Sequence, residues 1–386
     1  MTLENKENFN NHAKWQSFLP WHVLDELAAA GTASQPAGEV GQARVYQCVA
    51  LFADISGFTA ISEALGAAGH LGTEELTGIL NSYFDPMIDL IHQYGGSIGK
   101  FGGDAMTVLF PFVVERGGGR QAARAALQCA LEMQARMPAY AAIATSAGVY
   151  RLAMKAGLAA GPILCTLVGD PAVRLEFVIA GAVLDRCAEA EHHAAPGDVI
   201  AHEEVLALAE EALPEAAAPP WIHVACLAST TALMGLPEVG NLSAVPDEVA
   251  WAFIHPSIAE RLRQRQESFI NEHRRVTVLF MSFAGFDYDG DGSEAHGRRV
   301  CRELQDYLSQ VFKRVAAYSG YINKVDMGDK GSKIIILFGA PLAYEDDIQA
   351  ALCCALELVH LPGGAGAHRG QYWLCLLRPG WFRCTP

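Results

Sequence analysis

Residues 49–59, VALFADISGFT, join an apolar run to an acidic residue and then to a Ser-Gly turn. The apolar run has the length and composition of a buried β-strand. Asp54 stands at its end, where an unpaired carboxylate at the edge of a core would cost several kcal/mol. We therefore expect a polar partner or a cation beside Asp54.

The residues that follow alternate between helix and strand patterns. Residues 73–95 carry apolar residues at helical spacing and end at a Gly-Gly pair, which is a good helix stop. Residues 97–110, SIGKFGGDAMTVLF, predict two strands around a Gly-Gly-Asp hairpin. Further helices are expected over 120–137 and 182–194, and further strands over 151–169 and 174–181.

The same pattern occurs a second time along the chain. Residues 274–288, RRVTVLFMSFAGFDY, match residues 46–60, and the helix and hairpin that follow match as well. Equivalent residues include Phe52 and Phe280, Gly57 and Gly285, Tyr83 and Tyr307, Gly96 and Gly320, and Lys100 and Lys324. The chain therefore holds two copies of one unit, and related copies commonly pair about a pseudo-two-fold axis.

This repeat sets the expected domain organisation. We expect an N-terminal polar and amphipathic segment (1–43), a first domain (44–205), a connector (206–270), a second domain (271–360) and an aberrant tail (361–386). The tail has no strand alternation, so the second domain is expected to be C-terminally incomplete through truncation or frame disruption.

Bulk properties exclude several classes of function. The 386 residues carry a formal net charge of −15 without a basic stripe, which argues against nucleic acid as a partner. The ten cysteines are scattered, as in a reduced cytoplasmic protein. No run reaches the roughly 20 apolar residues of a membrane span, and the start lacks a signal-peptide pattern. A cytoplasmic protein is expected.

Two acidic residues are candidates for metal chemistry. Asp54 ends the first strand and Asp104 lies in the hairpin, so both are expected at one edge of the sheet. Carboxylates suit Mg²⁺ or Mn²⁺, and two such ions could orient a hydroxyl and stabilise a phosphoryl transition state. The alternative is that Asp54 caps the next helix and Asp104 is a solvated turn residue.

The motifs FADISGFTAI and GKFGGDAM resemble the metal-binding motifs of class III nucleotidyl cyclases, and the tandem arrangement resembles bicarbonate-responsive soluble adenylyl cyclases and their bacterial relatives. The resemblance implies an α+β fold of two ferredoxin-like cyclase domains, paired pseudo-symmetrically, with one catalytic site at their interface. It implies conversion of ATP to cyclic AMP and pyrophosphate in intracellular signalling. Pairing with a second chain is also open.

The resemblance assigns roles residue by residue. Asp54, Asp104 and the backbone carbonyl of Ile55 would hold two Mg²⁺ or Mn²⁺ ions. Phe58 and Thr59 of the same motif would lie at the substrate. Lys155 stands where a phosphate-contacting cation is expected, although a solvated strand lysine is an equally good interpretation.

The second copy would recognise the base. Lys324 occupies the position where adenylyl cyclases place the lysine that contacts adenine, whereas guanylyl cyclases usually carry an acid there. A lysine donates to an adenine ring nitrogen but accepts nothing from guanine, so ATP is favoured. Ser282 replaces the metal-binding acid, so the two copies are expected to have different roles.

A degenerate second pocket is expected around Lys100, the counterpart of Lys324. In the soluble cyclases this pocket takes bicarbonate, and Arg186 is the nearest candidate for the second cation. The family's Asn and Arg from the late second domain have no equivalent after Leu358. The chain could therefore be a catalytically impaired nucleotide- or anion-sensing module.

Two other classes fit the sequence less well. A diguanylate cyclase would carry an acid where Ala105 follows the Gly-Gly-Asp turn, and a P-loop enzyme would need a GxxxxGK[ST] motif, which does not occur.

Overall fold

The computed structural model describes residues 19–20, 23–24, 40–41, 43–114, 117–170, 173–211, 220–228, 251–264, 273–288, 294–327, 331–361 and 374–383. The chain divides into two compact units. The first-repeat unit comprises Tyr46–Ile163 and Gly181–Glu238, and the second-repeat unit comprises Met1–Val45, Leu164–Ala180 and Val239–Pro386. Most of the expected N-terminal segment and connector lies outside the described residues.

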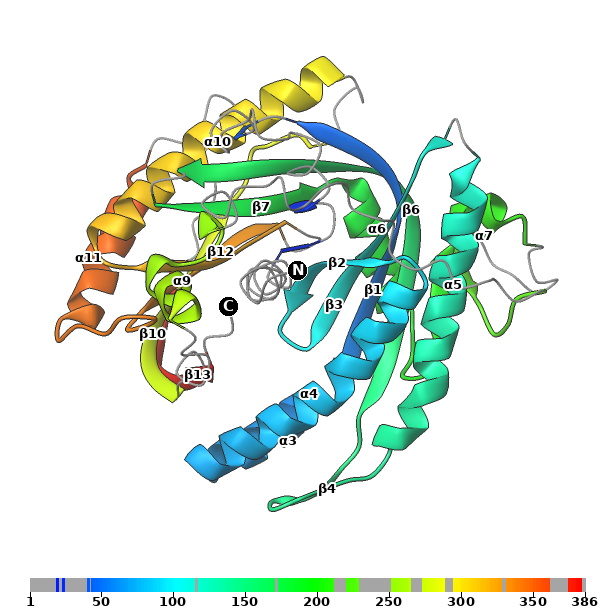
Figure 1. Cartoon of the computed structure of the whole chain (residues 1–386), viewed down its shortest axis with the longest axis horizontal. Helices are drawn as coiled ribbons and strands as arrows, with labels where there is room; N and C mark the ends of the chain where they lie inside the picture. Colours follow the sequence, from blue (N-terminus) through cyan, green and yellow to red (C-terminus); the bar gives the residue numbers. More distant parts are fainter. Residues whose placement is uncertain are drawn as a thin grey trace, which may run out of the picture. The chain divides into compact units, whose positions relative to one another are not determined.

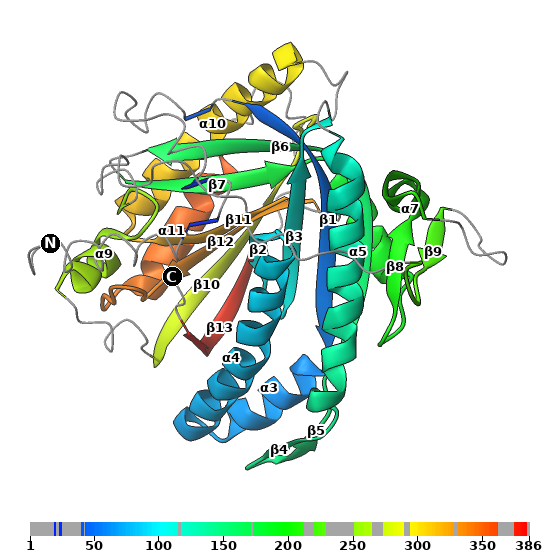
Figure 2. The ribbon, with the colours of Figure 1, turned by 45° about the vertical axis from the view of Figure 1, so that its right-hand side comes forward.

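The first-repeat unit is built on a mixed sheet with the order β2-β3-β1-β6-β8-β9. Its strands are β1 (Arg44–Ser56), β2 (Ser97–Gly102), β3 (Ala105–Phe112), β6 (Ala153–Asp170), β8 (Val199–His202) and β9 (Trp221–His223). Its helices are α3 (Phe58–Ala67), α4 (His70–Gln93), α5 (Gly118–Arg136), the 3₁₀ turn η4 (Met137–Tyr140), α6 (Ala182–His192) and α7 (Glu203–Ala209). Two short strands, β4 (Ile143–Thr145) and β5 (Gly148–Tyr150), pair with each other as a separate hairpin. Figure 2 shows α4 and α5 side by side over β1 and β3.

The second-repeat unit has the sheet order β11-β12-β10-β13. Its elements are β7 (Arg174–Ala180), α9 (Pro256–Arg263), β10 (His273–Phe283), α10 (Glu294–Ala317), β11 (Tyr321–Asp326), β12 (Ser332–Phe338), α11 (Asp347–Val359) and β13 (Leu374–Arg383). Helices α10 and α11 lie together (Figure 1) and share a core with the sheet.

Residues 164–180 differ from the expected domain boundary. They fall inside the expected first domain, 44–205, yet they cluster with the second-repeat unit. Val168, Val178 and Ala180 are buried in the same core as Leu304 and Leu308 of α10. Burial of these apolar side chains explains why this segment belongs to that unit.

The internal repeat is confirmed at the level of strand register. Phe52 lies opposite Thr107 in the first repeat, and the equivalent Phe280 lies opposite Ile335 in the second. The β2–β3 hairpin has an irregularity between Ile98 and Lys100, and β11–β12 has one between Ile322 and Lys324. Both copies thus keep the same pairing and the same bulge.

Side-chain contacts repeat as well. Tyr94 donates a hydrogen bond to Glu132 at 2.6 Å, and Tyr318 donates the same bond to Glu357 at 2.6 Å. In both copies the glycine before the hairpin is required, because a Cβ on Gly96 would lie 2.7 Å from a Phe110 ring atom and one on Gly320 would lie 2.9 Å from Phe338. The α+β fold that the family resemblance implies is confirmed.

The expected aberrant tail contains a strand. Residues 374–383 form β13, which pairs antiparallel with β10 at the place that β6 takes beside β1. The sequence predicted no strand here because residues such as Pro379 interrupt the alternating pattern. That prediction is wrong. Proline is tolerated on an edge strand or at a bulge, and the pairing is irregular opposite residues 276–278.

Among the residues that the structure describes, the helices are all too short or too polar to cross a bilayer.

Candidate active site

Asp54 and Asp104 are brought to one edge of the first-repeat sheet. Ala53 pairs with Met106 and Gly102 with Ala105, so Asp54 lies near the end of β1, close to the two-residue turn that carries Asp104. Ala53 and Ile55 point into the core, so the side chain of Asp54 alternates to the opposite face. The predicted convergence of the two carboxylates agrees with this register.

Electrostatics show that the two carboxylates affect each other. Burial raises the pKa of Asp104, a backbone hydrogen bond opposes this shift, and the charge of Asp54 raises it further. The buried hydroxyl of Tyr83 lies in the same field, because burial raises its pKa and the charges of Tyr140, Asp54 and Asp104 add to the shift. A cation between the carboxylates would relieve this repulsion.

The donor set fits a hard divalent cation. Mg²⁺ and Mn²⁺ sites need few carboxylates when waters and substrate phosphates supply the remaining oxygens. The two carboxylates are oxygen donors of this kind, and the carbonyl of Ile55 stays a predicted third ligand. Within the described ranges no cluster of three or more His, Cys, Asp or Glu side chains is placed to hold a metal, so a dedicated protein cage is absent there.

The Ser-Gly turn after Asp54 depends on Gly57. Its φ is +97°, and a Cβ there would lie 2.3 Å from the carbonyl oxygen of Arg151. Only glycine fits this left-handed turn in such close contact. The equivalent Gly285 has a φ of 103°, so both copies leave the strand in the same way.

Phe58 and Thr59 begin α3 after this turn. Phe58 is partly buried and packs against the first-repeat core, whereas Thr59 is exposed and its carbonyl accepts a hydrogen bond from Ser62. Neither side chain has a described contact with Asp54 or Asp104, so their predicted contact with substrate stays a prediction.

Lys155 has a structural partner. Its Nζ lies 2.7 Å from Oε1 of Glu191, whose side chain is 6% exposed. Gly157 permits this pairing, because a Cβ at Gly157 would lie 2.3 Å from the amide nitrogen of Glu191 and would push α6 away from β6. Both interpretations of Lys155 from sequence, phosphate contact and solvated lysine, missed this ion pair.

Lys324 lies on β11 directly after its bulge. Its Nζ is 3.1 Å from a carboxylate oxygen of Asp326, and the lysine side chain is 17% exposed. Ser282, which stands where Asp54 stands in the first copy, donates a hydrogen bond from Oγ to the carbonyl of Ser332. The second copy therefore has a cation beside its hairpin and a neutral hydroxyl at the strand end.

Lys100 and Arg186 are the predicted anion partners. Lys100 is partly buried on β2 opposite Thr107. Arg186 on α6 donates from an Nη to the carbonyl of Ala160 at 2.8 Å and lies 3.8 Å from Glu204. Arg186 is thus held by groups of its own unit, and no contact in the described part of the chain joins it to Lys100.

Tyr83 was not singled out as a site residue by the sequence. It is fully buried, and its hydroxyl donates to the sulfur of Met154 at 3.5 Å. The only indication from the sequence was that Tyr83 is equivalent to Tyr307 in the repeat. Such an equivalence does not show whether a residue serves packing or a functional site.

Comparisons with known proteins agree with this geometry. Residues 41–218 match the family model of the adenylate and guanylate cyclase catalytic domain, so this part of the chain is a class III cyclase domain. The chain is homologous to adenylate cyclase type 10, with 28% identity over 344 residues to the Homo sapiens protein, covering 80% of this chain and 20% of that protein. The Rattus norvegicus protein is 28% identical over 346 residues, with 82% and 21% covered. The chain spans about a fifth of the length of these relatives.

Similar solved structures include both kinds of cyclase. The guanylyl cyclase Cya2 is 25% identical, with a TM-score of 0.39, over 51% of this chain and 100% of that one. The adenylyl cyclase CyaB from P. aeruginosa is 23% identical, with a TM-score of 0.38, over 47% of this chain and 96% of that one.

Proposed function

We propose that this chain is an adenylyl cyclase that converts ATP to cyclic AMP and pyrophosphate in intracellular signalling. The observation that carries the proposal is the pair Asp54 and Asp104 at one strand end of a class III cyclase domain. Ser282 at the equivalent place of the second copy supports a division of roles between the copies.

Asp54, Asp104 and the carbonyl of Ile55 would hold Mg²⁺ or Mn²⁺. When bound, two such ions would lower the pKa of the ribose 3′-hydroxyl and neutralise charge on the phosphate oxygens. The raised pKa of Asp104 fits this role, since a cation stabilises the ionised carboxylates against each other.

Lys324 would select the base. Its ammonium group lies beside Asp326, so the pair presents one donor and one acceptor. The preference for adenine is proposed because Lys324 stands where the resembling adenylyl cyclases place their adenine-contacting lysine, whose ammonium donates to a ring nitrogen. We therefore propose ATP in preference to GTP.

Incubation of the purified chain with ATP or GTP and Mn²⁺ or Mg²⁺ tests the proposal, with cyclic nucleotide measured by mass spectrometry and excess EDTA as the control. Cyclic AMP from ATP, abolished by EDTA, is the expected result. Saturable nucleotide binding without any cyclic product would instead favour the alternative, a catalytically impaired nucleotide- or anion-sensing module.

Bicarbonate is a separate proposal. Lys100 and Arg186 would form its site if the two side chains come together on binding. Sodium bicarbonate should then raise turnover over sodium chloride at equal ionic strength and pH, and Lys100→Ala should remove the difference. An equal response in the variant would rule out Lys100.

A further inference from the structure

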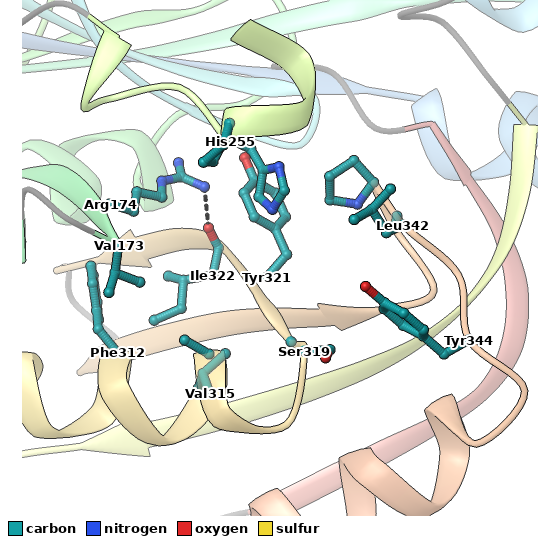
Figure 3. Close-up of a pocket in the computed structure, with 15 residues that line it drawn as sticks. Val173, Arg174, His255, Phe312, Val315, Ser319, Tyr321, Ile322, Leu342 and Tyr344 are labelled. Carbon is teal, nitrogen blue, oxygen red and sulfur yellow. Dashed lines mark hydrogen bonds between the residues drawn. The ribbon is translucent and has the colours of Figure 1, made fainter. Parts of the chain in front are cut away.

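A pocket of about 200 Å³ lies in the second-repeat unit (Figure 3), whereas the carboxylate pair belongs to the first-repeat unit. The start of β7, the start of α9, the end of α10 and the start of β11 form it, together with residues 340–344. Its apolar walls are Val173, Phe312, Val315, Ile322, Pro341 and Leu342. None of these residues belongs to the proposed active site.

Arg174 places a cationic group in the pocket wall. One Nη donates to the carbonyl of Ile322, the other lies 3.1 Å from Glu176, and the guanidinium carbon is 4.6 Å from the ring centroid of Tyr321. The Nε–H is buried and has no acceptor among the described residues. A buried donor without an acceptor costs about 1–3 kcal/mol, which a ligand oxygen could recover.

His255 supplies a second donor. Its Nδ1 accepts the backbone N–H of Ser257 at 3.2 Å, so in the neutral ring the proton resides on Nε2. Burial and the charge of Arg174 lower the pKa of His255 to about 4, so the ring is neutral at pH 7. The described residues give Nε2 no acceptor.

The two donors lie on the same aromatic ring. The imidazole is 5.3 Å from the ring of Tyr321, which Arg174 also covers (Figure 3). Both side chains therefore contact Tyr321 in the pocket wall, and a ligand acceptor beside this ring would have to meet them there.

Charge decides between an anionic and a neutral ligand. Glu176 already balances Arg174, and both side chains are largely buried, at 13% and 15% exposed. The neutral His255 adds no charge. Because a carboxylate would lose its hydration without meeting net positive charge, its burial is unfavourable, whereas a carbonyl oxygen loses far less.

We propose that this pocket binds a small neutral molecule with an apolar body and a single carbonyl oxygen, which accepts hydrogen bonds from Arg174 and His255. The volume equals that of about seven water molecules. It is smaller than the roughly 300–1,000 Å³ of drug-sized sites, so the ligand is fragment-sized.

Ligand-observed NMR titration of the full chain with three probes of similar shape tests the proposal. Acetophenone carries the carbonyl, ethylbenzene lacks it, and benzoate replaces it with a charge. Acetophenone should bind at least about tenfold more tightly than ethylbenzene, as one to two hydrogen bonds predict, and more tightly than benzoate. Equal affinities for acetophenone and ethylbenzene, or tighter binding of benzoate, would overturn the proposed ligand class.

A matched pair of variants locates the binding. Ala316 lines the pocket and its exposed neighbour Ala317 does not. Ala316→Phe should fill the pocket and reduce acetophenone affinity at least about tenfold, whereas Ala317→Phe should leave it unchanged. Equal affinity in both variants would show that acetophenone binds elsewhere and would refute the site.

Discussion

The two repeats share a scaffold but differ in their chemistry. Strand order, register, the hairpin bulge and the Tyr-Glu hydrogen bond are the same in both. The strand end after the shared scaffold carries Asp54 in one copy and Ser282 in the other. A repeated backbone therefore need not mean two repeated sites, and the charge at one position separates the copies.

The copies also differ in the burial of one helix. Leu127 of α5 is fully buried with Val205 and Leu206 of α7, whereas the equivalent Leu352 of α11 is 48% exposed. Ile348, Leu356 and Val359 form an exposed stripe with Leu352. Helix α7 packs on α5, and within the described residues no equivalent helix packs on α11. Two helices with similar sequence patterns are therefore buried to different extents.

Replacement of Asp54, the proposed metal-binding acid, should have the largest effect. Asp54→Ala should lower cyclic AMP formation by roughly a hundredfold or more, because it removes a charge that acts at the transition state. Ser282→Ala is the matched control in the second repeat and should keep most of the turnover. Similar losses in both variants would contradict the division of roles.

The equivalent leucines should differ in their contribution to stability. Leu127→Ala should lower the free energy of unfolding by about 2–5 kcal/mol, since it leaves a cavity in a packed core. Leu352→Ala should cost less than about 1 kcal/mol because half of that side chain is already in water. Chemical denaturation measures both, and a larger loss for Leu352→Ala would mean that α11 is buried in solution.

The equivalent lysines should differ in substrate selection. Lys324→Glu should shift the ATP/GTP ratio of kcat/KM by about tenfold towards GTP, as the loss of one base-specific hydrogen bond predicts. Lys100→Glu should leave that ratio unchanged. An unchanged ratio in Lys324→Glu would exclude its role in base recognition.

A further prediction concerns the pH dependence of stability. Because the folded pKa of His255 is about 4 and the unfolded value is 6.5, the unfolded chain binds an extra proton between these values. Stability from this group is present above pH 6.5 and is lost as the pH falls towards 4. Denaturation midpoints of His255→Gln, which cannot take up this proton, should fall less across that window than those of the original chain.

Local patterns predicted much of the fold. Neighbouring residues determine the apolar run before Asp54, the Gly-Gly-Asp hairpin and the helical spacing. The same elements occur in both repeats of the structure. The tail was predicted wrongly because β13 is stabilised by pairing with β10, a contact between distant residues that a proline-containing sequence does not reveal.

The candidate site was predictable only in part. Asp54 and Asp104 are joined by strand pairing that follows from the hairpin, so sequence sufficed. The partners of Lys155 and Arg186 come from α6, α7 and β6, and they depend on how closely these elements pack. Gly157 allows α6 to lie close to β6, and the sequence alone does not reveal this contact.

Mn²⁺ binding tests the central claim most directly. Electron paramagnetic resonance titration, with a non-cyclisable ATP analogue present, gives the affinity of the original chain, Asp54→Asn and Ser282→Ala. The account predicts an affinity lower by at least about tenfold in Asp54→Asn and unchanged in Ser282→Ala. Equal Mn²⁺ affinity in Asp54→Asn and the original chain would contradict it.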